Sequence, residues 1–226
     1  MQNTQGRGSS RRKIFALTAG AAVLGLGVTA TLAAWTDTEW VFGGDGTGGP
    51  GIGTSSFEVQ QNTDPAFAAG AWTDEESNPG GEMTFSLGAL ALSPGDATYA
   101  AVALRTAPTS IAGEVLLNAA VDAAGIAAND ADDLLFDALS LRVVTATAPF
   151  TCDATAFGGA NTTVASGALA TAAGSVAQPL TAAAGSVQYY CFEVSLPDPL
   201  TPAAGFDLDD YMGLTVAPAW EFTAES

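Results

Sequence analysis

The 226-residue sequence has no histidine and few basic residues, six in all, of which one is a lysine. Without histidine the chain cannot build a Ser-His-Asp triad, a Cys-His dyad or a histidine zinc site. The lysine is Lys13, in the N-terminal segment that we expect to be removed, so the remainder cannot use a Schiff-base or P-loop lysine. We therefore expect no enzyme, no cofactor and no metal site. Chemistry by carboxylates alone and calcium binding stay open, because 24 acidic residues are present.

Residues 1–33 have the three parts of a cleavable export signal. A basic stretch ending at Lys13 precedes an uncharged run, residues 14–28, that is rich in Ala, Leu and Val. Small residues then occupy the positions that a signal peptidase requires if it cuts between Ala33 and Ala34. The run is short for a membrane span, which needs about 20 residues, and its glycines weaken it as a helix. We expect cleavage and secretion. A retained anchor is the alternative, and both the Sec and the twin-arginine routes stay open.

Removal of the signal leaves Arg105 and Arg142 against all 24 acidic residues, a formal charge of 2 − 24 = −22. Such a surface repels nucleic acid and anionic lipid. We therefore expect no nucleic-acid partner and no stable membrane insertion after cleavage. Both cysteines, Cys152 and Cys191, lie in the exported part, and an even pair in an oxidising compartment predicts a disulfide. Two free thiols are the alternative.

Behind the signal the sequence predicts three parts. Residues 34–42 alternate like a strand and carry four large apolar side chains, Trp35, Trp40, Val41 and Phe42. Residues 43–54 are so rich in glycine that we expect a flexible tether. Residues 55–226 are long enough for one domain with a sizeable core.

Short alternating runs between Gly, Pro, Asn and Asp predict antiparallel β-structure in this domain. We expect strands near residues 55–61, 82–88, 97–106, 112–121, 139–147, 186–196 and 212–223. In the run after Gln188, Tyr190 and Phe192 share one face while Cys191 lies on the other. The predicted disulfide would therefore pin residues 148–185 to the outside of the sheet. Pro218 favours a sheet edge or a bulge, and the low-complexity stretch 158–187 is expected to be a long loop or a weak hairpin.

One short helix is predicted after Asn129 or Asp130, either of which can cap it. Asp132 and Asp133 would lie in its first turn, where the helix dipole favours acidic residues. An apolar stripe follows: Leu134, Leu135, Ala138 and Leu139. The acidic cluster here has two further members, Asp122 and Asp137. No spacing matches a calcium-binding EF-hand loop, so helix capping and a solvated acidic face are the favoured interpretation.

Four features, in this order along the chain, match one known family. The first is a glycine-rich signal core and small-residue cut followed by Ala34-Trp35-Thr36-Asp37. The others are Pro94-Gly95-Asp96 before an alternating strand, Asp132-Asp133-Leu134-Leu135-Phe136 before another strand, and the closing Trp220-Glu221-Phe222. In these the chain resembles the TasA/camelysin family, whose signals a dedicated signal peptidase processes. Its composition, high in Ala and low in Lys, is similar to an actinobacterial branch. The long tether and the cysteine pair depart from the better-known members.

The resemblance implies an all-β fold, an antiparallel jelly-roll-like β-sandwich with one short helix. It implies a secreted structural subunit of extracellular fibres in a biofilm matrix or at the cell surface, with other copies of itself and a signal peptidase as partners. In such fibres the N-terminal strand of one subunit completes the sheet of the next, head to tail. We expect four anchors for this donor strand, Trp35, Trp40, Val41 and Phe42. Folding of the strand onto its own domain is the alternative.

Two other functions stay open. One is a monomeric secreted module that binds sugars or a surface, and the other is a hydrolase that uses carboxylates. The metalloprotease activity sometimes ascribed to camelysin has no visible ligand set here, because the sequence contains no H-E-x-x-H motif.

Overall fold

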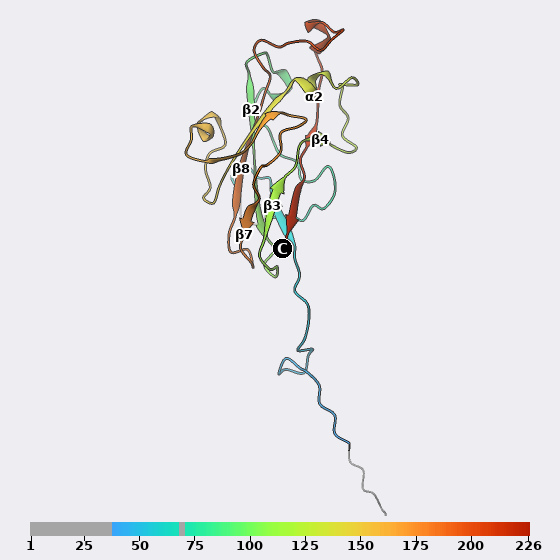
Figure 1. The fold of residues 1–226 in the computed structure, drawn as a ribbon, viewed down its shortest axis with the longest axis vertical. Helices are drawn as coiled ribbons and strands as arrows, with labels where there is room; N and C mark the ends of the chain where they lie inside the picture. The colour runs from blue at the N-terminus through green and yellow to red at the C-terminus, as the bar shows by residue number, and fades with distance from the viewer. Residues whose placement is uncertain (1–37, 68–70) are drawn as a thin grey trace, which may run out of the picture. The chain divides into compact units, whose positions relative to one another are not determined.

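The computed structural model describes residues 38–67 and 71–226. The chain divides into two units, one ending at Gly53 and a compact one over Thr54–Ser226. Within the described residues the compact unit is built from antiparallel strands and one short α-helix, which confirms the predicted all-β class (Figure 1). The strands are β1 (Val59–Asn62), β2 (Ala97–Thr106), β3 (Gly113–Leu117), β4 (Val121–Asp122), β5 (Ser140–Ala146), β6 (Thr162–Ala168), β7 (Gln178–Leu180), β8 (Gln188–Ser195), β9 (Pro218–Ala219) and β10 (Phe222–Glu225). The helices are α2 (Leu134–Ala138) and three 3-10 turns, η1 (Ala89–Ala91), η2 (Ala154–Phe157) and η3 (Leu208–Tyr211).

The larger sheet has five strands in the order β1-β2-β8-β5-β6. The central strand β8 pairs with β2 on one side, from Ala97↔Ser195 to Leu104↔Gln188, and with β5 on the other. Side chains alternate along β8. Tyr190 and Phe192 belong to the main core, whereas Cys191 between them lies on the opposite face of the sheet. We call the core-facing side the inner face and the opposite side the outer face.

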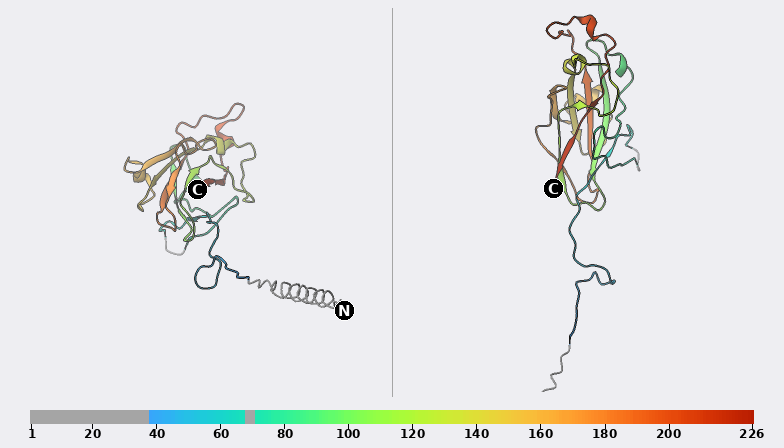
Figure 2. Two further views of the ribbon diagram at one scale, coloured as in Figure 1. Left: turned by 60° about the horizontal axis from the view of Figure 1, so that its bottom comes forward. Right: turned by 90° about the vertical axis from the view of Figure 1, so that its right-hand side faces the viewer.

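A three-stranded sheet, β10-β3-β7, faces the inner side of the larger sheet. Val115 and Leu117 of β3 and Leu180 of β7 belong to the same buried cluster as Phe192. Because one core joins the two sheets, the arrangement is sandwich-like. In the right-hand view of Figure 2 the red β10 and the green β2 lie in different layers. The jelly-roll connectivity implied by the family resemblance stays a prediction.

The long predicted strands at 97–106, 139–147 and 186–196 correspond closely to β2, β5 and β8. In all three runs the residues of the main core recur at every second position, and the three strands supply the centre of the larger sheet. The prediction of one strand over 112–121 is wrong. The chain pairs with β10 as β3, then leaves that sheet and pairs with β9 as β4.

Two other strand predictions need correction. The chain over 212–223 forms β9 and β10 with a break between them, since Pro218 belongs to a two-residue pair with β4 and the ladder with β3 starts at Phe222. Residues 82–86 of the stretch 82–88 join no sheet, and Leu87 and Gly88 form a turn. The low-complexity stretch 158–187, expected to be a long loop or a weak hairpin, is neither: it provides β6 and β7, which are edge strands of two different sheets.

Candidate functional site

The N-terminal segment exposes the large apolar side chains that the sequence offered as donor anchors. Trp40 is 92% exposed, Val41 95% and Phe42 76%. The remaining predicted anchor, Trp35, and the predicted cleavage position at Ala33 and Ala34 lie outside the described residues. Three consecutive apolar side chains in water are costly, at roughly 25 cal/mol for each Å² of apolar surface. Such a patch is typical of a surface that binds a partner.

The tether behind this segment is more ordered than its composition suggests. The Gly51 N–H donates to the Gly43 carbonyl at 3.1 Å, which closes residues 43–51 into a turn. Inside the turn the Asp45 carboxylate accepts hydrogen bonds from the Thr47 N–H and hydroxyl at 2.8 Å and from the Gly49 N–H at 3.0 Å. These bonds, that of the Thr47 backbone foremost, hold the pKa of Asp45 below its ordinary value of 3.8. The turn draws residues 43 and 51 together and so shortens the reach of the tether.

The outer face of the larger sheet carries the predicted disulfide. Cys152 and Cys191 are bonded, with their Cα atoms 5.2 Å apart and a sequence separation of 39 residues. The alternative of two free thiols is therefore wrong. Cys191 is fully buried under a small cluster with Val144 and Ala156, against which Phe150 and Phe157 pack. The disulfide thus pins the segment around η2 onto the outer face, as the alternation along β8 predicted. Disulfides of this kind are typical of extracellular proteins.

The same outer face holds both arginines of the compact unit. Arg142 forms a two-pronged ion pair with Glu193, with both N–O distances 2.7 Å, and its guanidinium lies 4.7 Å from the centre of the Phe157 ring. The hydrogen bond to Glu193 raises the pKa of Arg142. Arg105 instead donates to the neutral Gln60 side chain and stacks 4.1 Å from the centre of the Trp72 ring. Both positive charges are therefore engaged within the fold.

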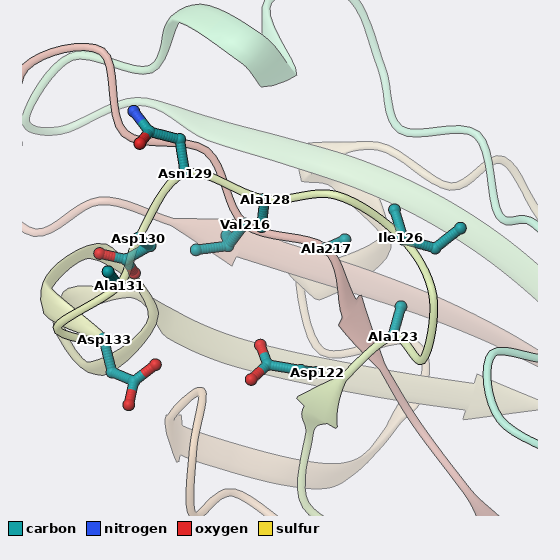
Figure 3. A pocket seen from close by; sticks show the side chains of 10 residues that line it. All are labelled: Asp122, Ala123, Ile126, Ala128, Asn129, Asp130, Ala131, Asp133, Val216 and Ala217. Carbon is teal, nitrogen blue, oxygen red and sulfur yellow. The ribbon is translucent and has the colours of Figure 1, made fainter.

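Three of the five aspartates of the predicted acidic cluster line a shallow cavity of about 280 Å³, and Asp132 and Asp137 do not. Its carboxylates come from different elements, Asp122 from β4 and Asp130 and Asp133 from the loop before α2 (Figure 3). Asp130 is occupied, because its two oxygens accept from the Leu135 N–H at 3.2 Å and the Phe136 N–H at 2.8 Å. No three acidic or cysteine side chains in the part of the chain that the structure describes converge as metal ligands.

The helix beside this cavity begins later than the sequence suggested. Leu134 is its first residue, so Asp132 and Asp133 precede the first turn, and Asp137 is the acidic residue within it. The prediction that Asp132 and Asp133 occupy that turn is wrong. Asp133 takes a left-handed conformation with φ 54° and directs the chain into the helix. The expected capping role falls to Asp130, whose carboxylate reaches the helix amides from the preceding loop.

The sequence did not predict how the segment Glu82–Ser86 is held. The segment lies beside β2 without forming a ladder with it. Met83 and Phe85 are half-buried against the main core, while Glu82, Thr84 and Ser86 are exposed. The Ser86 N–H donates to the Tyr99 carbonyl at 2.9 Å, and no other backbone–backbone hydrogen bond links residues 82–86 to β2 in the described part of the chain. The alternation that suggested a strand is therefore real in burial but not in pairing.

Comparison with known proteins gives no relative: no family model matches the chain and no curated protein matches it. Within residues 38–67 and 71–226, no helix has both the length and the apolar surface to cross a bilayer. Three features of the described residues bear on function: the exposed apolar segment at residues 40–42, the weakly attached segment at 82–86 and the disulfide.

Proposed function

We propose that this chain is a secreted structural subunit that assembles head to tail into extracellular fibres. The observation that carries the proposal is the exposure of Trp40, Val41 and Phe42 outside the compact unit. An alternating apolar segment of this kind can add to the sheet edge of another copy, where main-chain hydrogen bonds supply affinity and pockets select alternate side chains. Contacts of this head-to-tail type propagate instead of closing.

Three further points support a structural role in the extracellular space. The disulfide matches an oxidising compartment, and the sequence features of the signal match export. The four sequence features that resemble the TasA/camelysin family favour fibres of a biofilm matrix or cell surface. In this proposal a signal peptidase cuts between Ala33 and Ala34, and the cut frees the segment Ala34–Phe42 to bind the next copy. Processing and assembly would then be one event.

A monomeric sugar-binding module has less support. Such modules present exposed aromatic platforms, but Trp72 lies beneath Arg105 and Trp220 packs on Phe192 in the core. Trp40 is exposed, yet it lies outside the compact unit and not in a preformed site.

Electron microscopy of the chain beginning at Ala34 tests the proposal. We expect filaments that grow faster as salt rises, because screening relieves repulsion between subunits of formal charge −22. Deletion of residues 34–42 is expected to abolish growth and leave a folded monomer. A chain that stays a monodisperse monomer at every concentration of NaCl and CaCl₂ would contradict the fibre function. Filaments unchanged by the deletion would reject the donor strand alone.

A further inference from the structure

The edge of β2 next to Glu82–Ser86 is incompletely paired. In the antiparallel ladder, alternate residues of β2 direct their N–H and C=O groups toward β8, and the residues between them direct these groups toward β1. Ala103 faces Asn62 of β1, and Tyr99 faces Ser86. Ala101 lies between them and is 6% exposed, yet no described residue accepts from its N–H or donates to its carbonyl. Buried backbone groups are normally paired, so among residues 38–67 and 71–226 this edge is short of one strand partner.

The contact at Tyr99 shows how the resident segment departs from a ladder. The Tyr99 N–H donates to the Ser86 hydroxyl at 3.1 Å, where a regular antiparallel pair would use the Ser86 carbonyl. The hydroxyl of Thr98 also contacts Ser86, at 3.0 Å between the two side-chain oxygens. Side-chain contacts thus stand in for main-chain ones, and the segment holds β2 through the residue at its end.

The inner side of the same segment is also imperfectly satisfied. Phe85 packs beside Trp220, with the ring centres 6.4 Å apart. The Trp220 Nε1–H is buried, and no described group accepts a hydrogen bond from it. A buried indole N–H without an acceptor costs stability. The backbone groups of Ala101 and the Trp220 Nε1–H therefore both indicate that residues 82–86 leave neighbouring hydrogen-bonding groups without described partners.

The exposed N-terminal segment has the same pattern as the segment that fills this place. Glu39-Trp40-Val41-Phe42 and Glu82-Met83-Thr84-Phe85 both read glutamate, large apolar, β-branched, phenylalanine. In the second, Met83 and Phe85 face the core while the glutamate and threonine face solvent. Placed in the same register, Trp40 and Phe42 would face the core and Glu39 would keep its charge in water. Glycine 43 would follow where Ser86 now stands. With no hydroxyl to offer, Gly43 would meet Tyr99 with its carbonyl, as a ladder requires.

We propose that residues Glu39–Phe42 of a second copy displace Glu82–Phe85 and pair with β2 at Ala101. This inference rests on the proposed function and adds the acceptor site to it. The resident segment would act as a placeholder that covers the core of an unassembled subunit. The donor would exchange its almost fully exposed Trp40 and Phe42 for the places of the half-buried Met83 and Phe85. It would also supply the hydrogen bonds that Ala101 lacks.

Hydrogen–deuterium exchange on the chain beginning at Ala34 tests the site, with monomers and filaments compared. We expect the Ala101 amide to exchange at least about tenfold more slowly in filaments and the amides of residues 83–86 to exchange faster. Filaments that protect β6 or β10 instead, with Ala101 unchanged, would overturn the acceptor site while the fibre function stands. Protection of Ala101 in monomers, lost in Trp40→Ser/Phe42→Ser, would show that the segment occupies its own domain. A chain that forms no filaments rejects the fibre function itself.

A pair of variants gives a second test. Ordinary structural damage would weaken assembly, whereas loss of the placeholder is expected to strengthen it. Phe85→Ser weakens the placeholder, so we expect filaments to form at about tenfold lower protein concentration than for the unchanged chain. Leu87→Ser is the matched control, because Leu87 is apolar and fully exposed two residues away, and its threshold should stay within about twofold. A folded Phe85→Ser chain that assembles no better than Leu87→Ser would overturn the placeholder role. If Phe85→Ser does not fold, the exchange measurement on the unchanged chain decides.

Discussion

Two segments cover the five-stranded sheet without belonging to it, and they are held in different ways. The segment Phe150–Phe157 covers the outer face and is tied down by the Cys152–Cys191 disulfide and by aromatic packing. The segment Glu82–Ser86 covers the edge of β2 and is held by the half-burial of Met83 and Phe85 and, at Ser86 alone, by one backbone–backbone hydrogen bond and side-chain hydrogen bonds with Tyr99 and Thr98. The segment on the outer face is thus fixed by a covalent bond. The segment at the edge of β2 is held without one and, in our proposal, is replaced by residues Glu39–Phe42 of another copy.

The largest effect is expected from removing the donor side chains that compete for the edge. In Trp40→Ser/Phe42→Ser each substitution removes a contact worth about 1.5–3 kcal/mol, so the protein concentration needed for assembly should rise by roughly 10²–10⁴-fold. The melting temperature should not change, since both side chains are exposed in the isolated chain. Pelleting of polymer at a series of concentrations measures the threshold. Ile52→Ser, which removes an equally exposed apolar side chain of the tether, is the control, and an equal effect there would show general stickiness.

Removal of the disulfide should destabilise the fold and leave the assembly threshold unchanged. Cys152→Ser/Cys191→Ser releases a closed loop with a sequence separation of 39 residues, so the free energy of unfolding should fall by about 4 kcal/mol. Guanidinium chloride titration followed by tryptophan fluorescence measures the loss. At temperatures where the variant is folded, its assembly threshold should match that of the unchanged chain. If the folded variant did not assemble, the outer face would be part of the interface.

A smaller loss is expected at the ion pair on the outer face. Arg142→Gln leaves the buried carboxylate of Glu193 without its charged partner and should lower the free energy of unfolding by about 1.5–3 kcal/mol. Arg105→Gln is the matched control, since Arg105 has the same kind of stacking but a neutral hydrogen-bond partner. It should cost less than about 1 kcal/mol. Equal losses in the two variants would mean that packing of the side chains, and not the charge pair, stabilises the outer face.

The smallest effect concerns the turn in the tether. Because the folded turn lowers the pKa of Asp45, the turn is stabilised above the pKa of a free aspartate and loses that stabilisation as pH falls through the lowered pKa. NMR titration of the Thr47 amide should therefore give a midpoint below 3.8. In Asp45→Asn the titration should disappear. A midpoint at or above 3.8 would mean that residues 43–51 do not hold the turn in solution.

Much of the sheet was predictable because the main-core residues of its central strands recur at every second position. In β8, Tyr190 and Phe192 on one face and Cys191 on the other follow directly from a period of two. The disulfide followed from the compartment and the even number of cysteines. The edge strands did not follow: β6 is built mostly from Ala, Gly, Ser and Thr, which show little contrast between faces, and β7 has only three residues, one of them a proline.

The candidate site was only half predictable. The apolar pattern at residues 39–42 was visible in the sequence, and it predicted a donor strand. The acceptor was not, because Glu82–Phe85 has the same alternation as a strand that pairs fully. Alternation indicates which side chains face a core, but it does not tell whether the backbone finds a partner. A comparison of the two segments with each other would have given the signal, since they share one pattern.

Photo-crosslinking from position 42 tests the central claim most directly. Phe42→p-benzoylphenylalanine is introduced into the chain beginning at Ala34, filaments are grown from an equal mixture of unlabelled and ¹⁵N-labelled protein, and the cross-linked peptides are identified by mass spectrometry. The account predicts cross-links from position 42 to the peptides around Ala101 and Trp220, with half of them joining an unlabelled to a labelled chain. Cross-links confined to chains of one label would mean that the segment folds onto its own domain, and cross-links elsewhere would contradict the acceptor site.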